Sequence, residues 1–255
     1  MNIVRVVARS REDIPSDLDF LSAHALPGSF HDIISQADVV CCTCMSAGDY
    51  RLREYHFKSL LVDEASQATE PEVLIPLTKG IQHCILVGDH AQLPPTILNR
   101  SVAKAGLNVS LFERLVSNGL KPKMLQVQYR MHPCLSEFPS NMFYEGQLQN
   151  GVNKQLRYSN VFPWPTELPL LFYHVMGQEE MSGTGLSYLN RAEVSAIHKL
   201  SDYLKVEASQ LGIVTPYEGQ RAYLVDYLMS RSKWDMDQLE VASVDAFQGL
   251  SLIHI

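Results

Sequence analysis

Short apolar runs alternate along this chain with longer stretches in which hydrophobic residues recur at helical spacing. Each run ends in polar or turn residues, which is typical of parallel strands joined by helical crossovers. The pattern therefore predicts an α/β fold with mainly parallel sheets flanked by helices. The runs that we expect to be strands lie at 2–8, 38–44, 59–64, 83–89, 124–129, 170–175, 212–217 and 240–245.

Two of the predicted helices have recognisable starting residues. Ser110 followed by Glu113 forms an S-x-x-E capping box before LFERLVSNG, and Gly119 is placed to end that helix. Asn190 and Glu193 give a similar signal before AEVSAIHKLSDYL. In that second helix, one face carries Val194, Ile197, Leu200 and Leu204.

Composition narrows the class of protein. The 255 residues are 46% hydrophobic and 19% charged, which predicts a folded protein rather than a disordered one. The net charge is −7, from 21 Lys and Arg against 28 Asp and Glu, so any binding of nucleic acid must depend on local residues. No apolar run approaches the roughly 20 residues that cross a bilayer, so we expect no membrane association.

The chain shows one long polar segment and one candidate domain boundary. The segment 146–168 is polar and proline-containing, and we expect it to be a surface connection. A domain boundary is expected near Pro122, after the helix that Gly119 ends.

Three of the five cysteines, Cys41, Cys42 and Cys44, fall in the apolar run VVCCTC. Because neighbouring strand residues point to opposite faces, this spacing suits neither a disulfide framework nor a zinc knuckle. We interpret them as reduced thiols in a buried strand, which indicates an intracellular compartment.

An acid pair follows the apolar run SLLV, at Asp63 and Glu64. Ligands of α/β enzymes bind outside the carboxyl ends of parallel strands, so two carboxylates there can hold Mg²⁺ and orient a water molecule. Taken alone, the pair is better explained as solvated acids that simply follow a strand.

Two further strand ends carry chemistry of the same kind. Gln92 follows the run HCILVGD, and its side-chain amide could sense a terminal phosphate. In QYRMHP, Arg130 has the forked, permanent charge that suits a transferring phosphoryl group, and Tyr129 offers a flat ring for a purine. The alternative for that hexapeptide alone is a salt-bridged arginine and a core tyrosine.

The motifs DEAS, GDHAQLPP, QYRMHP, VTPYEGQ and ASVDAFQG occur in this order, and as a set they resemble the superfamily 1 helicases. Longer stretches narrow the match, among them CCTCMSAGDYRL, VQYRMHPCLSEFPSNMFYEGQLQNGV and GIVTPYEGQRAYLVDY. With these, roughly residues 37–249 resemble the up-frameshift-type RNA helicases of nonsense-mediated mRNA decay.

The resemblance implies two RecA-like domains, both incomplete in this chain. Residues 1–121 would be the C-terminal part of the first, ATPase domain, and 122–255 the N-terminal part of the second, with an aberrant tail at 250–255. ATP and Mg²⁺ would bind between the domains, and single-stranded RNA would run across both. Other mRNA-surveillance factors are implied as partners, and the cytoplasm as the location.

The resemblance also assigns roles to individual residues. Asp63 would hold magnesium, Glu64 would activate the attacking water, and Gln92 would sense the γ-phosphate. Tyr129 would stack on adenine, and Arg130 would be the arginine finger. The positions implied for nucleic-acid contact are Thr215, Pro216 and Ser243, and those implied for coupling to the nucleotide are Gln248 and Gly249.

The sequence departs from the family pattern in three main places, besides a minor replacement of Gly by Pro94. It contains no glycine-rich loop ending in Gly-Lys-Ser/Thr, it reads LSLIHI after Gly249, and the connection from Leu21 to Ala37 is short where relatives carry an RNA-contacting insertion. We therefore expect the 255-residue chain alone to bind and hydrolyse ATP poorly, because phosphate positioning is a major part of this catalysis.

Two other functions remain open from the sequence. One is a related superfamily 1 helicase that acts on DNA or on RNA:DNA hybrids. The other is a non-catalytic interaction module derived from the helicase.

Overall fold

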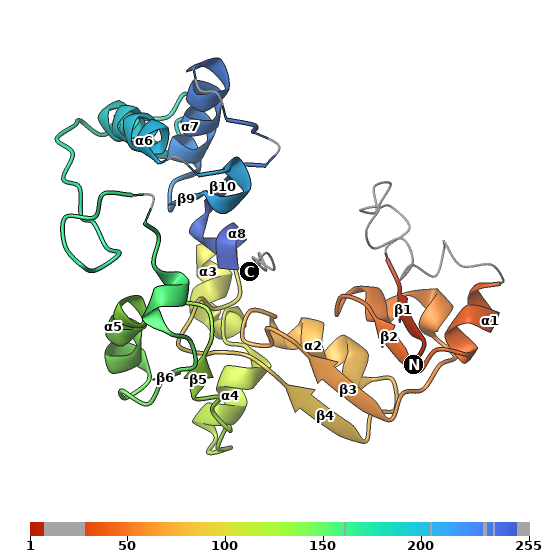
Figure 1. The fold of residues 1–255 in the computed structure, drawn as a ribbon. Coiled ribbons are helices and arrows are strands. Elements are labelled where there is room, and N and C mark those ends of the chain that lie inside the picture. Colours follow the sequence, from red (N-terminus) through yellow and green to blue (C-terminus); the bar gives the residue numbers. More distant parts are fainter. Residues whose placement is uncertain (8–28, 161, 205, 232–233, 237, 249–255) are drawn as a thin grey trace. The chain divides into compact units, whose positions relative to one another are not determined.

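The computed structural model describes residues 1–7, 29–160, 162–204, 206–231, 234–236 and 238–248 (Figure 1). The chain divides into two compact units: unit 1 is Met1–Lys123 and unit 2 is Met124–Ile255. In the described residues, strands pair in twos: β1–β2, β3–β4, β5–β6 and β9–β10 are parallel, and β7–β8 is antiparallel. Mainly parallel pairing with flanking helices confirms the predicted α/β class.

Unit 1 carries its strands in two parallel pairs. In chain order its elements are β1 (Ile3–Arg5), α1 (Phe30–Ser35), β2 (Val39–Cys41), β3 (Ser59–Val62), α2 (Glu70–Leu77), β4 (His83–Leu86), α3 (Arg100–Val102) and α4 (Leu111–Ser117), with a π-type turn at Ala103–Leu107. The β3–β4 register runs from Ser59 opposite His83 to Val62 opposite Leu86, so both carboxyl ends reach the same edge.

The core of unit 1 beneath β3–β4 comes from strand, turn and helices together. Val62, Ala65, Val73 and Leu111 form one buried cluster, and Val73 has no exposed surface. Helix α2 is started by a capping box, in which the Thr69 backbone N–H donates to the Glu72 carboxylate at 2.8 Å. The cap and the cluster together fix α2 against β3, directly after the turn that carries the acid pair.

Unit 2 contains β5 (Val127–Gln128), α5 (Pro133–Phe143), β6 (Gln149–Asn150), β7 (Glu180–Met181), β8 (Tyr188–Leu189), α6 (Arg191–Tyr203), β9 (Gly212–Thr215), α7 (Glu218–Arg231), β10 (Glu240–Ser243) and α8 (Val244–Gln248). Its buried core joins α6, α7 and the β9–β10 pair through Val194, Ala208, Ile213, Leu224, Leu228 and Leu239. None of the described helices has both the length and the apolar character that crossing a bilayer requires.

The predicted helix boundaries are confirmed, although only the Ser110 half of the expected capping box forms. The Ser110 hydroxyl accepts from the Glu113 backbone N–H at 3.1 Å, and Gly119 follows α4 with a φ of 95°. The backbone N–H groups of Gly119 and Leu120 close the helix end in a Schellman arrangement. The Asn190 side chain accepts from the first turn of α6.

A strand lies within every predicted run except 170–175, where the prediction is wrong. That segment pairs with no described strand, and its backbone makes a local turn in which the Leu170 N–H donates to the Leu168 carbonyl at 2.8 Å. Phe172 in this segment is 90% exposed. An apolar run becomes a strand only where another backbone supplies hydrogen bonds, and local pattern does not specify that partner.

The prediction that the cysteines of VVCCTC are buried is also wrong. All five cysteines of the chain are free, but Cys41 and Cys42 are exposed and Cys44 is half-buried. In β2 only the face that carries Val40 packs against a hydrophobic cluster, so the alternate position is left open. The pKa of Cys42 is nevertheless raised to about 11. The main cause is desolvation of the Cys42 thiol, and the neighbouring Cys44 and Cys41 raise the pKa further.

Candidate active site

Asp63 and Glu64 lie directly after β3, at the carboxyl edge of the β3–β4 pair, and both are exposed. The Glu64 backbone N–H donates to Asp63 Oδ1 at 3.1 Å. Glu64 has a φ of 50°, a left-handed conformation that few residues other than glycine adopt. Such backbone strain persists where surrounding contacts enforce it, and it is concentrated at functional sites.

The turn after β3 is fastened to the end of β4. The Ala65 backbone N–H donates to the Val87 carbonyl at 2.7 Å, and the Asp89 N–H donates to the Ser66 hydroxyl at 3.1 Å. Gly88 passes so close that a Cβ there would lie 2.8 Å from the Ser66 backbone nitrogen. The two motifs that follow β3 and β4 are therefore held at one edge, as the strand-end argument predicts.

Gln92 belongs to the same edge through Asp89. The Gln92 side-chain amide donates to Asp89 Oδ2 at 2.7 Å, and the Ala91 N–H donates to the other carboxylate oxygen at 3.0 Å. The Asp89 carboxylate thus orients the loop that carries the predicted phosphate sensor.

The oxygen groups at this edge fit a magnesium-bound phosphate better than a metal held by protein alone. Among the described residues, no group of three or more His, Cys, Asp and Glu side chains gathers as a metal cage. Magnesium that binds with a nucleotide needs only one or two carboxylates, because phosphates and water supply its other ligands. Asp63, exposed and at the strand end, can supply one of them.

The QYRMHP loop of unit 2 is organised by Gln128. The Gln128 side-chain oxygen Oε1 accepts from the backbone N–H groups of Arg130 and Met131 at 3.0 and 2.7 Å, and its side-chain nitrogen Nε2 donates to Asn150 Oδ1 at 2.6 Å. The loop leaves Arg130 exposed and Tyr129 64% exposed. Both side chains are therefore available to a ligand.

The Tyr129 ring also has a specific support. A Cβ at Gly151 would collide with this ring, so the glycine allows the Tyr129 ring to lie close against the backbone at position 151. The Arg157 guanidinium donates to the Tyr129 carbonyl at 3.1 Å and holds the same backbone.

The predicted nucleic-acid residues lie at the carboxyl edge of β9–β10. Thr215 and Ser243 are register partners across that parallel pair. Their hydroxyls accept from the backbone N–H groups of Tyr217 and Ala246, both at 3.3 Å. Pro216 is exposed, whereas Thr215 is only 8% exposed.

The last two predicted positions lie at the end of the described chain. Gln248 is the final residue of α8, and Gly249 lies outside the described residues. The structure thus groups Asp63, Glu64 and Gln92 in unit 1, and Thr215 with Ser243 in unit 2. Convergence of residues from both units on one nucleotide stays a prediction.

Sequence reasoning missed the residues that hold these groups in place. Gln67, Ser66 and Asp89 support the unit 1 edge, and Gln128 and Asn150 support the QYRMHP loop. Their signal is weak in a sequence, because a polar residue near a motif is usually solvated.

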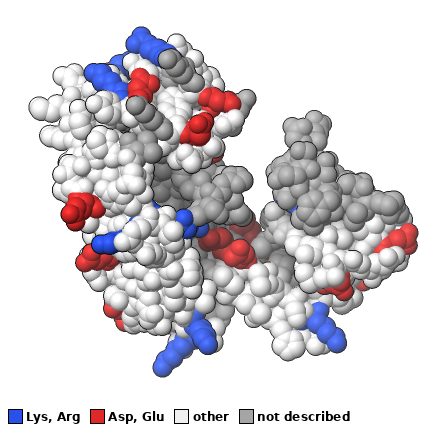
Figure 2. Space-filling view, in the orientation of Figure 1, with Lys and Arg blue, Asp and Glu red and all other residues white. Residues whose placement is uncertain are grey.

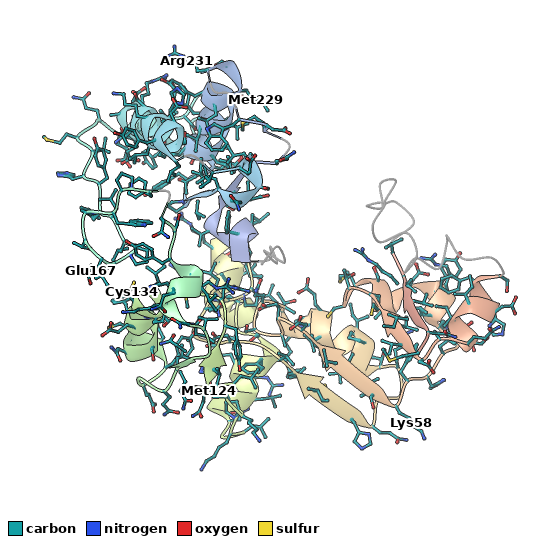
Figure 3. The ribbon with its side chains drawn as sticks, viewed as in Figure 1. Lys58, Met124, Cys134, Glu167, Met229 and Arg231 are labelled. Carbon is teal, nitrogen blue, oxygen red and sulfur yellow. The ribbon has the colours of Figure 1, made fainter. Side chains whose placement is uncertain are left out.

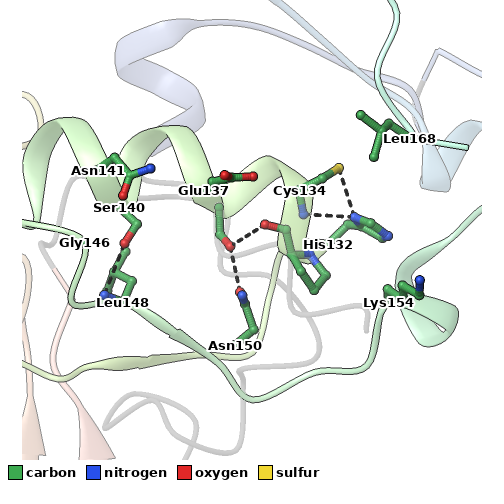
Figure 4. A pocket seen from close by; sticks show the side chains of 12 residues that line it. His132, Cys134, Glu137, Ser140, Asn141, Gly146, Leu148, Asn150, Lys154 and Leu168 are labelled. Atoms are coloured by element: carbon green, nitrogen blue, oxygen red, sulfur yellow. Dashed lines mark hydrogen bonds between the residues drawn. The ribbon is translucent and has the colours of Figure 1, made fainter. Parts of the chain in front are cut away.

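A cavity of about 500 Å³ opens in unit 2 between α5 and the segment that includes β6 (Figure 4). Its lining includes His132, whose Nδ1 contacts Cys134 Sγ at 3.0 Å, and Ser136, which donates to Asn150 Oδ1 at 2.6 Å. The dashed lines in Figure 4 mark these hydrogen bonds, which join polar groups of the cavity wall to one another. None of the residues predicted to act on ATP or nucleic acid lines this cavity.

Charge is mixed over the surface that Figure 2 shows, where acidic and basic side chains are interspersed. This agrees with the modest net charge of −7. The described residues on this face form no broad basic field of the kind that attracts nucleic acid.

The parallel strand pairs, with polar loops at their carboxyl edges and helices around them, define an α/β protein, a class in which that edge is the usual ligand site. Family models described as "AAA domain" match residues 2–100 and 107–252. Because the second match alone covers more than half of the chain, the chain belongs to this AAA-domain family.

The curated relatives agree with the resemblance to the up-frameshift helicases. The chain is 45% identical to "Regulator of nonsense transcripts 1 homolog" of Neurospora crassa, over 98% of this chain and 27% of the relative. It is equally identical to "ATP-dependent helicase upf1" of Schizosaccharomyces pombe and "ATP-dependent helicase NAM7" of Saccharomyces cerevisiae, over 98% of this chain and 32% and 30% of those proteins.

The chain thus spans about a third or less of the length of these relatives. The Neurospora alignment is 293 residues long, which exceeds the 255 residues of this chain. The relative therefore carries residues between the matched ends that this chain lacks, which agrees with the shortening inferred from the sequence. The position of that shortening, between Leu21 and Ala37, stays a prediction because it falls mainly outside the described residues.

Proposed function

We propose that the protein containing this chain is an ATP-dependent RNA helicase that acts in nonsense-mediated mRNA decay. One observation carries the proposal: Asp63, Glu64 and Gln92 share a single edge of β3–β4, fastened by the Ala65–Val87 and Ser66–Asp89 hydrogen bonds. The names of the relatives, which include helicases and regulators of nonsense transcripts, support the same class.

Each residue of that edge has a distinct task in the proposal. Asp63 holds Mg²⁺, which would neutralise charge on the phosphates when bound. Glu64 accepts the proton of the attacking water, and Gln92 bonds the terminal phosphate.

Unit 2 supplies the second half of the proposed site. Tyr129 stacks on the adenine, and Arg130 stabilises charge on the transferring phosphoryl group. Gln248 and Gly249 couple the nucleotide state to the nucleic acid. Closure of the two units around ATP and their release after hydrolysis would then drive stepwise movement.

The nucleic-acid contact that we propose is to the backbone of single-stranded RNA, through Thr215, Pro216 and Ser243. Hydroxyl groups bond phosphate whatever the base, which a translocating motor requires. DNA presents the same phosphates, so substrate preference has to be measured on matched RNA and DNA duplexes. Cytoplasmic location and association with other surveillance factors belong to the same proposal.

The test is ATP hydrolysis by the full-length protein that contains this chain, with Glu64→Gln. We expect kcat to fall by about tenfold or more, with ATP and RNA binding retained, because only the proton acceptor is lost. The matched control is Glu54→Gln, an exposed carboxylate of the same unit. Hydrolysis unchanged by Glu64→Gln would refute the proposed site.

A further inference from the structure

We propose that Gln67 is a positioning residue for hydrolysis, which holds the Glu64 carboxylate ready for the attacking water. This inference rests on the proposed function, because it needs Glu64 to act on water. It gives a role to Gln67, for which the sequence alone predicts none.

Gln67 forms hydrogen bonds to Glu64 through both its backbone and its side chain. The Gln67 backbone N–H donates to the Glu64 carbonyl at 2.9 Å, which closes a turn. Its side-chain amide donates to Glu64 Oε2, also at 2.9 Å. Both distances are ordinary for N–H···O hydrogen bonds, so the two residues form one closed local unit.

That unit rests on buried residues. Ala65 and Ser66, between the two partners, are 1% and 3% exposed. They also carry the hydrogen bonds to Val87 and Asp89 that fasten the turn to the end of β4. Gln67 is therefore placed by the rigid part of the edge, whereas the Glu64 side chain extends into solvent.

An exposed glutamate needs such a partner. A free Glu side chain samples many rotamers, and ordering it costs conformational entropy. The φ of 50° at Glu64 aims the side chain, and the bond to Gln67 restrains its end. Because that bond uses Oε2, the other carboxylate oxygen, Oε1, remains for the proton of a water molecule.

The same edge repeats this arrangement once more. Gln92 donates its amide to Asp89, three residues earlier, as Gln67 does to Glu64. The loops after β3 and β4 thus each pair a carboxylate with the side-chain amide of a residue three positions later. In the loop after β3, the Glu64 carboxylate acts on water, and the Gln67 amide positions that carboxylate.

The test uses kinetics of the full-length protein with Gln67→Ala. We expect kcat for ATP hydrolysis to fall by about tenfold while KM for ATP changes less than about twofold, because orientation of the base matters in the transition state. Gln67→Glu, which replaces the donor by an acceptor, should lose at least as much. Gln82→Ala is the matched control.

The control lies at the opposite edge of the same strand pair. The Gln82 backbone N–H donates to the carbonyl of Lys58, which precedes β3 and is labelled in Figure 3. The Gln82 side chain is exposed. Its removal should leave both kcat and KM unchanged.

A double-mutant cycle separates positioning from a merely structural role. Gln67→Ala made in the Glu64→Gln background should cause little further loss, because the side chain it positions has already lost its function. A loss of the same size in both backgrounds would overturn the inference, and so would wild-type kcat in Gln67→Ala. If Glu64→Gln itself leaves hydrolysis unchanged, the proposed function fails and the inference falls with it.

Discussion

Gly88→Ala should loosen the edge that joins β3 to β4. An alanine Cβ would lie 2.8 Å from the Ser66 backbone nitrogen, 3.1 Å from its hydroxyl oxygen and 3.2 Å from the Ala65 nitrogen. Ordinary contact of a Cβ begins near 3.4 Å, so the two turns would have to separate by about 0.6 Å. Two of these atoms are backbone, which cannot rotate away as a side chain could.

Overpacking of this kind typically costs about 1–3 kcal/mol. The hydrogen bonds from Ala65 to Val87 and from Asp89 to Ser66 span the gap that has to widen. We therefore expect the amides of Ala65 and Asp89 to exchange with solvent roughly 5- to 150-fold faster in the variant, which is that cost expressed as a ratio.

Hydrogen exchange of the 255-residue chain, read by mass spectrometry at these two amides, measures the effect. The matched control is Gly183→Ala, since a Cβ there would meet no atom within 4 Å. Equal exchange rates at Ala65 and Asp89 in the two variants would refute the close approach of Gly88 to the turn after β3.

Three further predictions concern other parts of the chain. Arg130→Ala in the full-length protein should lower kcat for ATP hydrolysis more than it weakens ATP affinity, and a loss of affinity alone would remove the arginine-finger role. Gln128→Ala should lower the free energy of unfolding, measured in urea, by about 1–3 kcal/mol, because the side-chain amide that bonds the QYRMHP backbone is removed. An unchanged free energy of unfolding would contradict that role. The raised pKa of Cys42 keeps its thiol protonated to higher pH than in the unfolded chain, so stability should fall as pH rises from 9 towards 11. At pH 9 the thiolate fraction of Cys42, and with it the rate of alkylation by iodoacetamide, should be about fiftyfold lower than for an ordinary cysteine, and equal rates would disprove the shift.

Local signals in the sequence were sufficient for several features. Ser110 and Asn190 were recognised as helix caps, because a cap needs only its own side chain and the next turn. Asp63 and Gln92 were expected at a shared edge, because parallel strands place their carboxyl ends together.

Features that depend on a distant partner were not predictable in the same way. Residues 170–175 have the apolar character of a strand, but no described strand pairs with them. Cys41 has the pattern of a buried strand position, yet only the alternate face of β2 is covered. Likewise nothing in the spacing of Gln67 distinguishes an amide that holds Glu64 from one that faces water.

The most direct test of the account is a structure of the full-length protein with Mg²⁺ and a non-hydrolysable ATP analogue. The account predicts that Asp63 binds Mg²⁺ directly or through water. It also predicts that the Gln92 amide and the Arg130 guanidinium both lie within about 3.2 Å of oxygens on the γ-phosphate. A nucleotide bound elsewhere, with these three side chains on unconnected surfaces, would contradict it.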